Sequence, residues 1–82
     1  MTREKVEQTI DHAKALRLAL SVVFSEHGVQ QVEYLNFNDE SFDDTWVDDD
    51  DNLAFYDEVN NRWVLINITR IKSINIHEKV IF

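Results

Sequence analysis

The first part of the chain has the hydrophobic periodicity of an α-helix. Apolar side chains recur at spacings of three and four residues, as on one face of a helix: Val6, Ile10, Ala13, Leu16, Leu20, Val23 and Phe24. Thr2 can cap the N-terminus, and Gly28, the only glycine, follows His27 where a helix end favours positive φ. The pattern predicts one long helix over residues 2–27.

A second apolar strip lies on the opposite side of this predicted helix. It consists of Ala15, Leu18 and Val22. Such a strip is either covered by the rest of the domain or faces another chain. The sequence is compatible with both alternatives, and the second would make Leu18 and Val22 a self-association surface in a homodimer.

After Gly28 the chain changes to short runs rich in β-branched and aromatic residues. The alternation of the first run breaks near Val32, as it does at a β-bulge. Asn60 and Asn61 predict a two-residue hairpin turn, because Asn tolerates positive φ. Strand-like runs occur at residues 29–37, 41–47, 53–59 and 62–71, and one or two short strands are expected at residues 73–76 and 79–82.

The run at residues 62–71 is the most apolar of these segments. Val64 and Ile66 point to one side, whereas Trp63 and Leu65 point to the other. Apolar side chains on both faces predict a central strand. The fold class expected from all these patterns is α+β, with one long N-terminal helix packed on a four- to five-stranded antiparallel meander sheet in a single domain of residues 1–82.

Composition narrows the class of protein further. The chain has 82 residues and no cysteine, which leaves no disulfide and no thiolate metal site. Charged residues interrupt the N-terminal region where a secretory signal would need an apolar run. No apolar run in the chain approaches the roughly 18 residues that span a bilayer. We therefore expect a cytoplasmic protein.

The charge is distributed unevenly along the chain. The formal net charge is −8, and residues 18–61 contain twelve acidic residues without a single Lys or Arg. Direct binding to nucleic acid or to an anionic membrane requires cationic side chains, so both are disfavoured. The partner expected for this surface is a basic protein, in particular a nucleic-acid-binding protein or a nuclease.

Eight of these acids and two aromatic residues form the candidate partner-binding site. The acids supply the charge, and an exposed aromatic side chain would supply the desolvated contact that interfaces require. Carboxylates two residues apart on a strand lie about 6.6–7 Å apart, similar to successive phosphates of a nucleic-acid strand. The proposed residues are Asp43, Asp44, Trp46, Asp48, Asp49, Asp50, Asp51, Tyr56, Asp57 and Glu58.

No motif for metal binding or catalysis accompanies the acidic block. Asp48, Asp50 and Asn52 match the opening of a calcium loop, but Leu53 and Val59 stand where that loop needs Gly and Glu. The three histidines are scattered, and one glycine cannot build a phosphate-binding loop. We expect neither a cofactor nor a metal, and a protein that is not an enzyme.

In size, charge and lack of cysteine the chain resembles the small acidic inhibitors of phages and mobile elements. These include anti-CRISPR proteins, anti-restriction nucleic-acid mimics and uracil-DNA glycosylase inhibitors, and the chain is also similar to immunity proteins that block nuclease toxins. The run DDTWVDDDDN at residues 43–52 carries this likeness. It is a likeness of composition without a shared motif, so no family residue is transferred.

This resemblance implies a non-enzymatic inhibitor that occludes the nucleic-acid site of its partner. Four alternatives stay open from the sequence. The acidic block can be a solvated rim that keeps the protein soluble. The chain can be an assembly module that self-associates through Leu18 and Val22, or an immunity protein for a nuclease toxin. The weakest alternative is a sensor of divalent ions.

Overall fold

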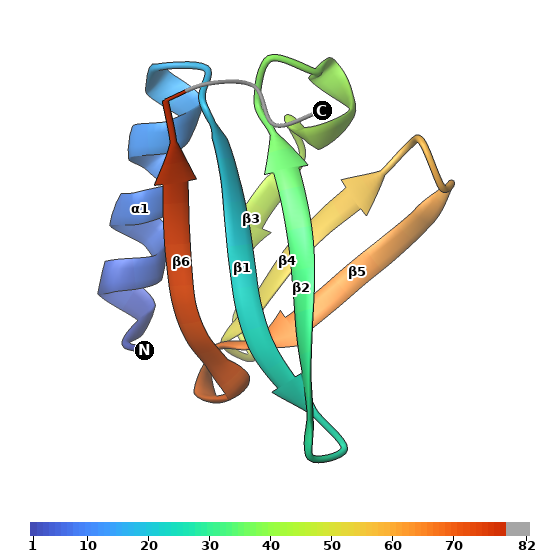
Figure 1. Ribbon diagram of the computed structural model, residues 1–82. Helices are drawn as coiled ribbons and strands as arrows, with labels where there is room; N and C mark the ends of the chain where they lie inside the picture. Colours follow the sequence, from blue (N-terminus) through green and yellow to red (C-terminus); the bar gives the residue numbers. More distant parts are fainter. Residues whose placement is uncertain (79–82) are drawn as a thin grey trace.

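The computed structural model describes residues 1–78 and shows one α-helix with two three-stranded antiparallel sheets (Figure 1). The α+β class is confirmed, whereas the single meander of four to five strands is wrong. The elements are α1 (Arg3–Ala15), β1 (Ala19–Glu26), β2 (Val29–Asn36), the 3-10 turn η1 (Glu40–Phe42), β3 (Thr45–Val47), β4 (Asn52–Asp57), β5 (Arg62–Asn67), the 3-10 turn η2 (Ile68–Arg70) and β6 (Ile71–His77).

The two sheets enclose one hydrophobic core. One sheet has the strand order β2-β1-β6 and the other β3-β4-β5, and Figure 1 shows the first in front of the second. Helix α1 runs beside β6 and contacts β3, so it covers one side of the two sheets (Figure 1). The largest fully buried side chains come from all three layers: Val6, Leu20, Val22, Leu35, Phe37, Leu53, Phe55 and Ile66.

Helix α1 is only about half as long as predicted. It ends in a Schellman motif in which the N–H of Leu18 donates to the Ala13 carbonyl at 2.9 Å and that of Arg17 to the Lys14 carbonyl at 3.2 Å. Arg17 takes the left-handed conformation with φ 52° that usually belongs to glycine. The expected helix over residues 2–27 is therefore wrong after Ala15. Within the described residues no helix is long and apolar enough to cross a membrane.

The segment that follows the helix is strand β1 because its side chains also alternate with a period of two. Leu20, Val22 and Phe24 point into the core between the sheets and are at most 5% exposed. Gly28 belongs to the β1–β2 hairpin, where it follows His27, and both residues have positive φ, 51° and 77°, as a type I′ turn requires.

Strand β5 is an edge strand rather than the predicted central strand. It pairs only with β4 in the sheet order, so Val64 and Ile66 are buried while Trp63 and Leu65 are each 55% exposed. The turn before it spans residues 58–61, because Asp57 pairs with Arg62, and is longer than the predicted two residues.

Three smaller expectations have mixed outcomes. The pairing of β1 with β2 is regular through Val32, and the irregularity lies instead between Val23 and Phe24, where β1 pairs with β6. Of the run at residues 41–47 only β3 is a strand, since its first part is η1. Residues 73–76 lie in β6, and the strand expected at residues 79–82 falls outside the described residues.

The free edge of β3 is covered by basic side chains of α1. The Lys14 ammonium donates to the Thr45 carbonyl, and the Arg3 guanidinium donates to the carbonyls of Val47 at 2.9 Å and Asp48 at 2.5 Å. These carbonyls would otherwise lack a partner at the sheet edge. Helix and sheet are therefore joined by hydrogen bonds as well as by the core.

Candidate functional site

Three of the predicted acidic site residues are paired with cations of the same chain, two of them at exposed positions. Arg17 contacts the Asp43 carboxylate at 2.9 Å, and Arg3 contacts that of Asp51 at 3.0 Å. The hydrogen bond that Arg3 donates to Asp51 is also the main reason why the pKa of Arg3 is raised. Both pairs are exposed and contribute little to stability, but they neutralise charge that the sequence left unpaired.

Asp48 builds the turn between β3 and β4. Its carboxylate accepts hydrogen bonds from the backbone N–H of Asp50 at 2.9 Å and of Asn52 at 2.8 Å. The bond from the Asn52 N–H is the main cause that lowers the pKa of Asp48. Asp51 supplies the positive φ of 60° that closes this three-residue turn. The residues that resemble a calcium loop thus form a hairpin.

Asp57 has a similar structural role at the β4–β5 turn. It is only 5% exposed, and its carboxylate accepts from the Asn60 side-chain amide at 2.7 Å and from the backbone N–H of Val59 at 3.1 Å. Arg62 lies between two acids, 3.1 Å from Glu33 on β2 and 3.8 Å from Asp57. Asp57 therefore stabilises the fold and is not available to a partner.

The other four predicted acids are exposed to solvent and are not paired with a cation of the described residues. They are exposed, and none takes part in a salt bridge within residues 1–78: Asp44, Asp49, Asp50 and Glu58. Asp44 precedes β3 and Glu58 follows β4, so they lie at one end of the antiparallel sheet. Asp49 and Asp50 lie at its other end. The structure splits the acidic block into two groups.

Between these two acidic groups lies an exposed cluster that we call the aromatic face: Trp46, Tyr56, Trp63 and Leu65 on the outer side of β3-β4-β5. The ring centroids of Trp46 and Trp63 are 5.5 Å apart and those of Tyr56 and Trp63 5.2 Å apart, both edge to face. The Tyr56 hydroxyl donates to the side chain of Asn61. Two tryptophans that are 46% and 55% exposed are uncommon on a protein surface without a binding role.

A small residue makes this arrangement fit together. Ala54 is the cross-strand partner of both Trp46 and Leu65 and is only 2% exposed, although it points outward with them. Its small side chain leaves room for the larger neighbours to cover it. The aromatic face is therefore a packed surface layer rather than a set of separate side chains.

A groove adjoins the aromatic face where α1 passes the edge of β3. It has a volume of about 350 Å³ and is lined by Glu7, Ile10, Asp11, Lys14, Thr45, Trp46 and Val47. Trp46 belongs to both the groove and the aromatic face. The groove carries the Asp11 carboxylate, which has no salt bridge within the described residues.

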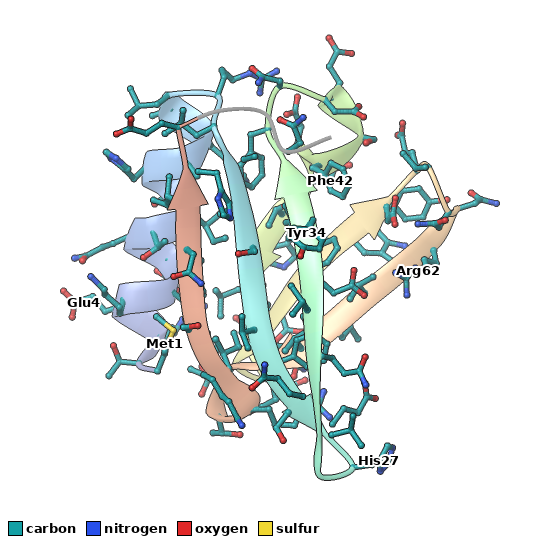
Figure 2. The ribbon with its side chains drawn as sticks, viewed as in Figure 1. Met1, Glu4, His27, Tyr34, Phe42 and Arg62 are labelled. Atoms are coloured by element: carbon teal, nitrogen blue, oxygen red, sulfur yellow. The ribbon has the colours of Figure 1, made fainter. Side chains whose placement is uncertain are left out.

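A second hollow lies on the side of the molecule that α1 leaves open. There β5 and its turn diverge from β2 (Figure 1), and a cleft of about 430 Å³ is lined by Glu33, Tyr34, Asp39, Phe42, Asp57, Val59 and Asn60. Figure 2 shows Arg62, whose guanidinium connects Glu33 to Asp57, on β5. Two carboxylates of this cleft, those of Glu33 and Asp57, are thus paired with Arg62, and the pair with Glu33 joins β5 to β2 of the other sheet.

The described residues bring together few groups that could carry out catalysis. Ser21 and His77 are 3.1 Å apart on the outer face of β2-β1-β6, a pairing that the sequence analysis missed. Ser21 is only 5% exposed, and no carboxylate is hydrogen-bonded to His77 within residues 1–78. The pair therefore lacks the accessible nucleophile and the orienting acid of a hydrolase triad. No group of three metal-ligating side chains occurs in the same part of the chain.

The predicted self-association strip does not form a surface. Val22 is fully buried in β1, and Leu18, just before that strand, is half-buried. The two residues looked like neighbours only on a helix that is not there. A second chain could not contact Val22 without opening the core.

Trp46 and Tyr56 were predicted as site residues, whereas Trp63 and Leu65 were not. Trp63 and Leu65 alternate with Val64 and Ile66 along β5, and this alternation was interpreted as burial of both faces of a central strand. Comparison of the chain with protein-family models, with curated protein sequences and with solved structures gave no significant match.

Proposed function

We propose that this protein is a non-enzymatic acidic binding protein that inhibits a partner by covering its basic, nucleic-acid-binding surface. The observation that supports it best is the aromatic face with free carboxylates at both ends. Within the described residues the outward positions of β3-β4-β5 carry no Lys or Arg, since Arg62 bonds to Glu33. Such a surface attracts cations electrostatically and offers apolar area to bury on contact.

Only some of the eight predicted acids are available to a partner. All eight were predicted to contact it, but those that pair with arginines or build turns are engaged within the chain. The free charge lies at Asp44, Asp49, Asp50 and Glu58. We therefore place the contact with the partner on the face between them, and a nucleic-acid-like row of charges is not required.

The test compares two variants that remove the same formal charge. The rim variant carries Asp44→Asn, Asp49→Asn, Asp50→Asn and Glu58→Gln. The control variant carries Glu4→Gln, Glu26→Gln, Glu40→Gln and Glu78→Gln, at exposed acids outside the aromatic face. Figure 2 shows Glu4 on α1, on the side away from the strands.

Each protein is immobilised and used to capture proteins from a cell lysate at low salt, followed by elution in a salt gradient. We expect the wild type and the control variant to retain nucleic-acid-binding proteins that a DNA duplex displaces, because both ligands compete for one basic surface. The rim variant should lose them. Equal capture by both variants, or no displacement by DNA, would contradict the proposal.

A further inference from the structure

The corner where the aromatic face meets the groove between α1 and β3 combines the aromatic ring of Trp46 with the carboxylate of Asp11. We propose that it receives an arginine side chain of the partner, with the guanidinium stacked on the Trp46 ring and directed toward the Asp11 carboxylate. This inference rests on the proposed function and names the group that is recognised. Trp46 and Asp11 both line the groove, so an exposed aromatic ring and a carboxylate share one hollow, whereas the second carboxylate there, Glu7, is paired with Arg3 at 2.6 Å.

The charges around this corner favour a cation over a nucleobase. A site that stacks bases needs cationic side chains for the phosphates that follow. Lys14 is the only cation among the described residues that line the groove, and its ammonium donates to the Thr45 carbonyl and lies 6.0 Å from the Phe37 ring centroid. Arg3 lies beside the groove, where it pairs with Glu7 at 2.6 Å and donates to the Val47 carbonyl at 2.9 Å. Both cations are therefore directed to their own chain, while Asp11 has no salt bridge within the described residues.

The shape of the corner favours arginine over lysine. A guanidinium is planar, stacks on an aromatic ring and donates several hydrogen bonds at once, whereas a lysine ammonium is strongly hydrated. A second copy of this chain is a poorer occupant, because each copy has a net charge of −8 and contact would bring the acidic rims together.

The test uses three peptides of identical length: an arginine-rich peptide, its lysine counterpart and its uncharged citrulline counterpart. Binding is measured by calorimetry at low salt. We expect the arginine peptide to bind about three- to tenfold more tightly than the lysine peptide, and the citrulline peptide to bind weakest. Trp46→Leu should remove the preference for arginine, and Trp46→Phe should retain part of it. Asp11→Asn should reduce the preference too, and it remains informative if Trp46→Leu does not fold.

Each outcome separates this inference from the proposed function. If arginine and lysine peptides bind equally to the wild type, the acidic binding function stands and the arginine site is refuted. If neither peptide binds, both proposals fail. A dimer in sedimentation that Trp46→Leu dissociates would assign the corner to a second copy. Binding of a single-stranded oligonucleotide that depends on Trp46 would assign it to nucleic acid, and either result overturns the inference.

Discussion

The two sheets share one core but have different outer faces. The outer face of β2-β1-β6 carries small or polar side chains such as Ser21 and Ser73, together with Val32 and Tyr34, which are 40% and 50% exposed. The outer face of β3-β4-β5 carries the aromatic face. Both sheets are three-stranded and antiparallel, so the requirements of the fold do not explain why only one of them exposes two tryptophans. This difference supports the binding role that we propose for the second sheet.

The two sheets also differ in how their turns are stabilised. All three hairpin turns contain a residue with positive φ, but only the turns of β3-β4-β5 also depend on carboxylates, those of Asp48 and Asp57. Acidic residues thus serve both to fold the second sheet and to give it a negative surface. Counting charges in the sequence could not separate these two uses.

The largest expected effect contrasts the two sides of β3-β4-β5. Phe55 is 1% exposed on the inner side, so Phe55→Ala should lower the free energy of unfolding by about 3–5 kcal/mol in a denaturant titration. Trp63→Ala on the outer side should cost only about 0.5–1.5 kcal/mol, since it loses edge-to-face contacts at a surface. If Trp63→Ala lowered the free energy of unfolding as much as Phe55→Ala, the aromatic face would be part of the core. The contrast between the two outer faces would then be refuted.

The next prediction tests the structural use of the acids. Asp57→Ala should destabilise the protein by about 1–3 kcal/mol, because the N–H groups of Val59 and Asn60 in the β4–β5 turn lose their acceptor. Glu58→Ala, one residue further on and exposed, is the matched control and should change stability by less than about 0.5 kcal/mol. Chemical denaturation measures both, and equal effects would contradict a division between structural and free acids.

The smallest effect concerns pH. Because folding lowers the pKa of Asp48, its ionised form contributes stability above the pKa of the unfolded state, and this contribution disappears as pH falls through the folded-state pKa. Asp48→Asn should therefore reduce the melting temperature at neutral pH, and the difference from wild type should shrink toward about pH 3. Asp49→Asn is the control, and a difference for Asp48→Asn that stays constant with pH would refute this explanation.

Part of this fold is predictable from the sequence, for identifiable reasons. The start of α1 at a Thr2 cap, the hairpin strand after Gly28 and the inward side of β5 follow from capping and alternation. The segment from Leu18 to Glu26 does not, because its apolar residues satisfy the helical period and the strand period together. The helix ends at Arg17, which takes a left-handed conformation, so the glycine that usually marks a helix end in a sequence is absent there.

The candidate site was predictable in kind but not in detail. The acidic composition and Trp46 pointed to the sheet β3-β4-β5, whereas Trp63 was assigned to the interior because exposed aromatic residues violate the usual pattern of burial. Such violations are expected where a surface serves binding rather than folding. The cations that neutralise Asp51 and Asp43 are Arg3 of α1 and Arg17 of the turn after it. Both are far away in the sequence, so only the tertiary structure reveals those pairs.

The hydrogen bonds from Lys14 and Arg3 to the carbonyls of β3 restrict how other proteins can approach this sheet. A foreign strand that tried to extend the sheet at β3 would find Thr45 and Val47 already occupied and would have to displace two basic side chains first. Growth of the sheet by strand addition, the route to fibrils and swapped dimers, is therefore blocked at this edge. A partner of β3 is directed to the broad surface of the sheet instead.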